Sequence, residues 1–206
     1  MKNLPTKIIL ATNNPGKLEE FRTLFKTLSV DFVTQSALNV PTIEETGTTF
    51  LENALIKARN ASKHGHLPAI ADDSGLVVPV LNNSPGVYSA RYAGDKATDQ
   101  MNNQKLVADM QSQSHLPNYQ KAYFFCCMIF LIHSDHPAPL IATAKWYGHI
   151  IDKPRGHNGF GYDPHFLVEG GDLTSAELEI AHKNRISHRG MATRKLVRNL
   201  KAQAPS

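Results

Sequence analysis

Adjacent carboxylates at Asp72 and Asp73 are the first feature of the sequence that could do chemistry. They lie in PAIADDSGLVVPV, residues 68–80, between small and apolar residues. Side chains alternate across a strand, so two neighbouring acids cannot both face solvent from a half-buried sheet. Acids at the end of an apolar strand face water in a cleft, a cation or a cap. A plain turn at Ser74 and Gly75 stays open as the alternative.

Two further acids, Glu44 and Glu45, precede a helix expected over residues 49–64. Acids in this place often only suit the helix dipole. With Asp72 and Asp73, however, they supply the oxygen ligands that Mg²⁺ prefers beside phosphate oxygens. The carboxyl ends of strands are also where open α/β sheets bind ligands. These acids therefore indicate a metal–phosphate site.

The segment ATNNPGK, residues 11–17, is typical of a turn from a strand into a helix. The first turn of a helix presents backbone N–H groups to phosphate, and Lys17 adds a positive charge. The segment is not a Walker loop, because it holds one glycine and Leu18 follows the lysine. An ordinary strand-to-helix turn stays open as the alternative.

A glycine-rich loop, GHNGFGYDP, occupies residues 156–164. It does not lead into a helix, which disfavours a dinucleotide-binding fold. Phe160 or Tyr162 could stack on a nucleobase instead, and a turn between strands is the alternative. The later segment HKNRISHRG, residues 182–190, concentrates basic side chains, although such a run is usually a solvated helix face.

Elements of an α/β fold must position these segments. Apolar periodicity predicts strands over 7–12, 30–34 and 68–73 and helices over 17–28, 49–64 and 98–110. Thr49 and Glu52 have capping-box spacing, as do Thr174 and Glu177 before a C-terminal helical stretch that is interrupted near Ser187. Two β-rich runs, 121–133 and 139–150, predict an antiparallel hairpin. This order favours a mixed sheet with flanking helices.

The composition bounds the class of protein. A length of 206 residues with 41% hydrophobic residues suits one domain over residues 1–206 with a sizeable core. A formal charge of +4 fits an anionic ligand but is too weak to indicate nucleic acid. No apolar stretch reaches the length of a membrane span, so a cytoplasmic protein without a membrane partner is expected. Cys126 and Cys127 are expected to be reduced core residues.

Taken together, the motifs resemble the inosine/xanthosine triphosphate pyrophosphatase family, whose members hydrolyse non-standard purine nucleoside triphosphates. The segments that carry the resemblance stand in the family's order: ATNNPGKLEEF, EETGTTFLENALIKA, ADDSGLVVPVL, PGVYSARYAG, GFGYDPHF and ISHRGMA. The resemblance implies an elongated mixed α/β sheet with flanking helices and two lobes around a central substrate cleft. It also implies a homodimer, Mg²⁺ as cofactor, and release of pyrophosphate and the monophosphate.

The resemblance further implies a role for each matching residue. Asp73 would be the proton acceptor and, with Glu44, a metal ligand. The substrate-binding residues would be Thr12, Asn13, Asn14, Pro15, Gly16 and Lys17 for the phosphates, then Ser74, and Phe160, Gly161, Tyr162, Asp163, Lys183, His188 and Arg189 for the nucleoside. The chain departs from the family at His182, where an acid that would orient Lys183 is common.

Base selectivity follows from hydrogen-bonding chemistry. Hypoxanthine and xanthine present a carbonyl at position 6, where adenine presents an amine. Arg189 is a donor only and His188 can donate, so both would pair with the carbonyl and meet the adenine amine donor to donor. The residues predict a preference for ITP, dITP and XTP over ATP, with a smaller margin over GTP.

Three other functions are weighed against this one. A nucleotide pyrophosphatase of the septum-formation-inhibitor type is the nearest, and SHRG and GFGYDP count against it. A nucleic-acid-binding module would suit the basic isoelectric point, but four clustered acids would repel a phosphate backbone. A non-catalytic nucleotide sensor would not need Glu44 and Asp73.

Overall fold

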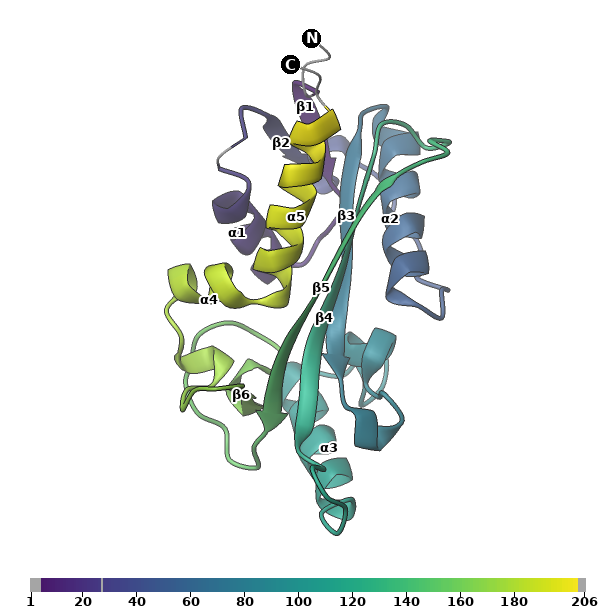
Figure 1. Cartoon of the computed structure of the whole chain (residues 1–206). Helices are drawn as coiled ribbons and strands as arrows, with labels where there is room; N and C mark the ends of the chain where they lie inside the picture. The colour runs from purple at the N-terminus through teal and green to yellow at the C-terminus, as the bar shows by residue number, and fades with distance from the viewer. Residues whose placement is uncertain (1–4, 27, 204–206) are drawn as a thin grey trace. The chain divides into compact units, whose positions relative to one another are not determined.

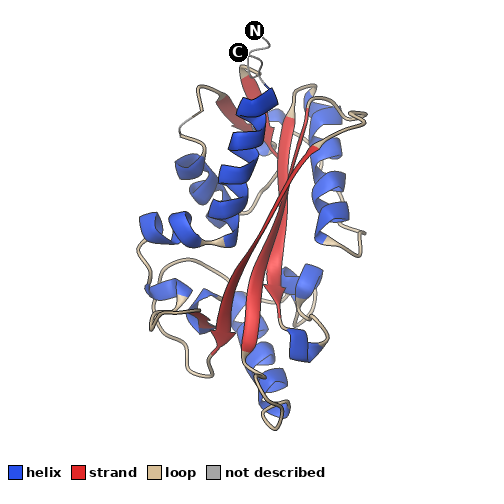
Figure 2. Cartoon of the chain, viewed as in Figure 1, coloured by secondary structure: helices blue, strands red, loops and turns tan. Residues whose placement is uncertain are grey.

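The computed structural model describes residues 5–26 and 28–203. Within these residues, strands and helices alternate along the first half of the chain (Figures 1 and 2). The strands are β1 (Lys7–Leu10), β2 (Asp31–Thr34), β3 (Ala69–Val77), β4 (Lys121–Leu131), β5 (Leu140–Ile150) and β6 (Phe166–Val168). The α-helices are α1 (Pro15–Leu24), α2 (Phe50–Gly65), α3 (Asp99–Ser112), α4 (Ile180–Ile186) and α5 (His188–Gln203). Short 3₁₀ helices span Ser36–Leu38, Pro79–Leu81, Gly86–Arg91, Asp163–His165 and Ser175–Glu177.

The sheet is mixed, as the sequence predicts. Its strand order is β2-β1-β3-β4-β5-β6. β1 pairs in parallel with β2 and β3, whereas β5 pairs antiparallel with β6. β4 and β5 are neighbours, and the connection over residues 132–139 is shorter than the dozen or so residues that a parallel crossover needs. The expected hairpin is therefore confirmed.

The chain divides into two compact units made of separated segments. The first holds Met1–Asp73, Cys126–Ala144 and Arg189–Ser206, and the second holds Ser74–Phe125 and Lys145–His188. β3, β4 and β5 contribute residues to both units. Among the described residues, no helix is long and apolar enough to cross a membrane.

The first unit has helices on both faces of its part of the sheet. α1 and α5 lie on one side and α2 lies on the other (Figure 1). Phe21 of α1 and Phe25, the residue that follows this helix, pack with Ile8 and Leu10 of β1 in one buried cluster, which Leu196 of α5 also joins. Cys126 belongs to this cluster, and both cysteines are free and buried, as expected.

Local capping explains where the helices of the first unit begin. Asn14 caps α1 by accepting a hydrogen bond from the N–H of Lys17, and Pro15 suits the first helical position. α2 begins after Thr49, whose capping box with Glu52 is complete. The predicted helix starts were therefore close, although α1 ends at Leu24, before the expected boundary.

In the second unit, the expected end of β3 is wrong. The strand does not turn at Ser74 and Gly75 but continues to Val77. A Cβ on Gly75 would lie 2.4 Å from the carbonyl oxygen of Gly86, so the glycine permits a close backbone approach. The hydroxyl of Ser89 then accepts a hydrogen bond of 2.9 Å from the N–H of Leu76, which supports the continued strand.

Aromatic rings and a second capping box organise the rest of this unit. Phe124, Trp146, Phe166 and His188 form a buried aromatic cluster. The Thr174–Glu177 box is present, but it opens the 3₁₀ helix Ser175–Glu177 instead of a long helix. The expected helical interruption is confirmed at Ser187, between α4 and α5.

Candidate functional site

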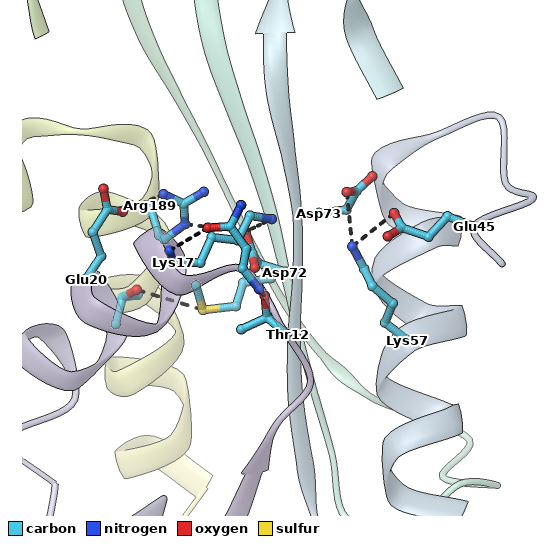
Figure 3. A network of polar contacts seen from close by, with 11 residues as sticks. Thr12, Lys17, Glu20, Glu45, Lys57, Asp72, Asp73 and Arg189 are labelled. Carbon is cyan, nitrogen blue, oxygen red and sulfur yellow. Dashed lines mark hydrogen bonds and ion pairs between the residues drawn. The ribbon is translucent and has the colours of Figure 1, made fainter. Parts of the chain in front are cut away.

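Asp72 and Asp73 point to opposite faces of β3 (Figure 3). A strand alternates its side chains, so consecutive residues meet different helices. Asp72 faces Lys17 of α1, with 2.9 Å between Oδ2 and Nζ. Asp73 faces Lys57 of α2, with 3.1 Å between Oδ1 and Nζ. The two acids therefore belong to two separate polar networks of the first unit.

The end of β1 lies beside the part of β3 where both networks form. Its pairing with β3 ends at Leu10 and Ile70, after which the chain turns into α1. Asp72 and Asp73 thus lie just beyond the carboxyl end of β1, although they are in the middle of β3. The expected location at the end of their own strand is therefore wrong, and the strand end beside the two acids is that of β1.

The Asp72 network is buried and consists of alternating charges. Nε of Arg189 lies 3.4 Å from Asp72, and a terminal nitrogen of Arg189 binds Glu20. Burial alone would raise the pKa of Asp72, but Lys17 and Arg189 outweigh it and hold that pKa well below its usual range. Burial opposes the charge of Arg189, yet Glu20 and Asp72 raise its pKa. Asp72 and Arg189 are therefore both charged at neutral pH.

The Asp73 network joins one lysine to two acids. Nζ of Lys57 lies 3.1 Å from Asp73 and 3.0 Å from Glu45. Glu45 is held near α2 because the following segment is tied to that helix: Gly47 N–H donates to Oδ1 of Asn53 at 2.8 Å. Burial opposes the charge of Lys57, but the surrounding carboxylates outweigh it and raise its pKa.

Asp73 has the properties of a base. Burial raises its pKa above the ordinary value, even though Lys57 and Lys17 act in the opposite direction. An aspartate with a raised pKa is a stronger proton acceptor than a solvated one. Its Oδ2 is buried and has no hydrogen-bond partner among the described residues. This oxygen is therefore available to a water molecule or a metal ion.

The acids fit a divalent cation that also binds phosphate. No group of three His, Cys, Asp or Glu side chains gathers at ligand distance within the described residues. Mg²⁺ on a nucleotide, however, takes only one or two carboxylates beside the phosphate oxygens. Asp73 and Glu45 share the ammonium of Lys57 and can supply them, whereas Glu44 is exposed. The metal role of Glu44 stays a prediction, and Glu45 joins it as a candidate.

The turn before α1 offers fewer backbone donors than the sequence suggests. Thr12 Oγ1 accepts from Asn14 N–H at 3.2 Å, and Asn14 Oδ1 accepts from Lys17 N–H at 3.0 Å. Pro15 has no N–H. In the first turn, the N–H of Gly16 remains for an anion, and Asn13 is exposed beside it.

In the second unit, two predicted nucleoside-binding residues, Phe160 and Lys183, bind the side chain of a third, Asp163. This buried carboxylate accepts from Phe160 N–H at 2.9 Å, from Ser175 Oγ at 2.6 Å and from Lys183 Nζ at 2.5 Å. Asp163 therefore binds and orients Lys183, although the preceding residue, His182, is not an acid. Ser74, another predicted substrate-binding residue, lies in β3.

The aromatic residues of the same loop differ in accessibility. Phe160 is half-buried, and its ring lies 5.5 Å from Lys183 Nζ. Tyr162 is buried, and its hydroxyl donates to the carbonyl of Ser89 at 2.8 Å. His188 stacks on Phe124, with 4.8 Å between ring centroids. Phe160 is thus better placed than Tyr162 to stack on a base, a role that stays a prediction.

Sequence reasoning did not find Lys57, Glu20 or Ser175. Lys57 has Ala54 and Ala61 three and four residues away on α2, and this spacing could have indicated a lysine with room to reach inward. Glu20 binds Arg189 across 169 positions of sequence, and no spacing rule connects residues so far apart.

Known proteins resemble this chain along most of its length. Residues 8–199 match the Ham1 family. The dITP/XTP pyrophosphatase of Burkholderia pseudomallei is 50% identical over 198 residues, covering 95% of this chain and 93% of that protein. The dITP/XTP pyrophosphatase of Vibrio cholerae is 49% identical, covering 96% and 98%. A HAM1 protein from Coxiella burnetii has a TM-score of 0.88 at 46% identity, covering 95% and 98%.

Proposed function

The chain belongs to the Ham1 family, and from this membership we propose that it hydrolyses ITP, dITP and XTP to the monophosphate and pyrophosphate. It is a nucleoside-triphosphate pyrophosphatase, a hydrolase of acid anhydrides. The observation that carries the proposed chemistry is the buried, unpartnered Oδ2 of Asp73 beside Lys57.

The positive charges of the first unit suit the triphosphate. Lys17 projects from the first turn of α1, where the Gly16 N–H adds a donor and the helix dipole favours an anion. Phosphate oxygens would compete with Asp72 for the ammonium of Lys17. We assign the outer phosphates to this turn, so that pyrophosphate is the leaving group.

Asp73 would act on the attacking water. Oδ2 accepts its proton while the water oxygen bonds to the α-phosphorus, and the bond from that phosphorus to the bridging oxygen of the β-phosphate breaks. Lys57 keeps the other oxygen of Asp73 occupied, which fixes the direction of Oδ2. Burial strengthens the base, so Asp73 is better suited to this step than a solvated aspartate.

Asp73, Glu45 and Glu44 are the residues that would hold Mg²⁺. The bound cation supplies charge neutralisation for the phosphates and lowers the pKa of a coordinated water. Lys17 would contribute a second positive charge toward the leaving pyrophosphate.

The purine base is assigned to the residues of the second unit around Asp163. Phe160 offers a ring face, and Lys183 is held by Asp163. His188 and Arg189 stay the predicted donors for the 6-carbonyl, although Arg189 also binds Glu20 and Asp72.

We further propose a single catalytic domain that acts as a cytoplasmic homodimer, with no nucleic-acid or membrane partner.

A substrate panel tests the proposal. ITP, dITP, XTP, GTP, ATP and modified pyrimidine triphosphates are compared with and without Mg²⁺, with pyrophosphate as the measured product. We expect Mg²⁺-dependent turnover that is fastest for the 6-oxopurines other than guanine. Preference for modified pyrimidines would favour the septum-formation-inhibitor type of enzyme. Tight binding without turnover of any triphosphate would favour a nucleotide sensor.

A further inference from the structure

Helix α3 holds the peptide groups on both sides of Gly161. The N–H of Gly161 donates to Oδ2 of Asp99 at 2.7 Å, and its carbonyl accepts from Nδ2 of Asn103 at 2.9 Å. Asp99 and Asn103 are four residues apart on α3, so they lie one above the other on the same helix face. All three residues belong to the second unit.

Asp99, Asn103 and Gly161 all line one cavity. The cavity has a volume of about 690 Å³ and is lined by residues of α3 and of the segment 152–165, among them Gln104, Val107, His157 and Pro164. A segment beside a cavity has few packing contacts on that side, so hydrogen bonds contribute more to its position.

Gly161 lies between the two loop residues that matter most for the proposed base site. Phe160 precedes it, and Asp163, which binds both Phe160 N–H and Lys183, follows two residues later. Gly161 has a φ of +62°, a region that costs other residues energy, and a Cβ there would meet nothing within 4 Å. The glycine is therefore suited to its backbone conformation, and the hydrogen bonds from α3 hold that conformation in place.

We propose that Asp99 and Asn103 are positioning residues for nucleobase recognition. By fixing both peptide groups of Gly161, they hold the ring of Phe160 and the Asp163–Lys183 pair at the spacing that the base requires. This inference rests on the proposed function. It predicts that loss of either hydrogen bond weakens binding of the nucleotide while leaving the hydrolytic step, which belongs to Asp73, largely unchanged.

Matched variants separate the hydrogen bonds from the charge of Asp99. Asp99→Ala removes both the acceptor and the favourable charge at the start of α3, whereas Asp99→Asn removes the charge and keeps an acceptor oxygen. Asn103→Asp keeps the size of the side chain but replaces the donor with an acceptor. Gln104→Ala is the control, because Gln104 lines the same cavity on the same helix.

Two measurements are made on each variant. Hydrogen exchange of the Gly161 amide, in the protein without nucleotide, reports how firmly α3 holds Gly161 through its two hydrogen bonds. Steady-state kinetics with ITP report its consequence. We expect faster exchange and a KM raised roughly 3- to 10-fold in Asp99→Ala, with kcat within about twofold of wild type. Asp99→Asn should lie close to wild type in both exchange rate and KM, because it keeps the acceptor oxygen. Asn103→Asp should have the same KM as Asp99→Ala. Gln104→Ala should match wild type in both measurements.

Unchanged exchange at Gly161 in Asp99→Ala, or a KM equal to that of Gln104→Ala, would overturn the inference alone. So would an equal loss of kcat and kcat/KM in Asn103→Asp, because that pattern belongs to the chemical step. A wild-type protein that does not hydrolyse ITP would instead overturn the proposed function, and the inference with it. Asn103→Asp keeps Asp99 at the start of α3. It therefore tests the hydrogen bond to the Gly161 carbonyl even if Asp99→Ala fails to fold.

Discussion

Asp72 and Asp73 are consecutive in the chain, yet each binds its own lysine on its own face of β3. Asp72 lies 2.9 Å from Lys17, and Asp73 lies 3.1 Å from Lys57 (Figure 3). Lys17 and Arg189 hold Asp72 in the ionised state, whereas Asp73 has a raised pKa and one buried oxygen without a partner. The adjacent acids therefore differ in chemistry: Asp72 organises positive charges, and Asp73 can accept a proton.

Asp73→Asn should abolish most turnover while leaving nucleotide binding largely intact. The amide keeps the shape of the side chain but cannot accept the proton, and loss of a general base typically lowers kcat by about 10²- to 10⁴-fold. Single-turnover kinetics with ITP measure the loss, and circular dichroism confirms that the variant is folded. Near-normal kcat in a folded variant would remove Asp73 from the mechanism.

Lys57→Met should shift the acidic limb of the pH profile for kcat/KM to higher pH. The pKa of Asp73 is already raised by burial, and Lys57 is the strongest group that lowers it. Without that ammonium the pKa rises further, and each added unit leaves about tenfold less carboxylate at pH below both values. Lys63→Met, which changes an exposed lysine of the same helix, is the control. An unshifted limb would show that Lys57 does not set the ionisation of Asp73.

Asp72 should make the protein acid-sensitive. Its pKa is lowered in the folded state, so below about pH 4 the unfolded chain binds a proton that the folded chain does not. The stabilisation is present above that range and is lost as the pH falls toward the folded value. Urea unfolding at pH 5, 4 and 3 should show a steeper loss of stability in wild type than in Asp72→Asn.

The control for this experiment is Asp31→Asn, because Asp31 forms an exposed ion pair with Lys7 at 3.4 Å. Exposed pairs contribute little to stability. The control should therefore keep the wild-type pH dependence. Equal slopes in wild type and Asp72→Asn would show that another group causes the acid sensitivity.

Arg189→Ala should lower kcat/KM for ITP far more than for ATP and so collapse the ratio between them. The prediction follows from a donor facing the 6-carbonyl, and an unpaired buried donor against adenine costs roughly 1–3 kcal/mol. Arg189 also separates the buried acids Glu20 and Asp72, so its removal should destabilise the fold. Arg189→Lys keeps a positive charge there and serves if Arg189→Ala does not fold. Equal losses for both substrates would show that Arg189 acts through its ion pairs with Glu20 and Asp72 and does not recognise the base.

The sequence predicted the local features well, because they depend on neighbours in the chain. The turn from β1 into α1, the capping box at Thr49 and Glu52, and the break at Ser187 follow from short-range hydrogen bonding and periodicity. The paired acids also indicated a site. Strand alternation already implied that the two acids point to opposite faces of β3. It did not identify the lysines that they contact.

Long-range contacts could not be predicted, because nothing in the local sequence specifies them. Lys57 approaches Asp73 across 16 positions, and Asn103 reaches Gly161 across 58. The continuation of β3 through Gly75 depends on Gly86 and Ser89, whose approach no turn rule reveals. Propensity favoured a turn there, and tertiary packing overrode it.

The most direct test of the central claim is the identity of the products that the wild-type protein forms from ITP. Purified protein is incubated with ITP and Mg²⁺, and the nucleotide and phosphate products are resolved by chromatography at early times. If Lys17 and the α1 turn hold the outer phosphates while Asp73 directs water to the α-phosphorus, IMP and pyrophosphate appear together in equal amounts. IDP with orthophosphate as the first products, or no turnover of ITP, would contradict the account.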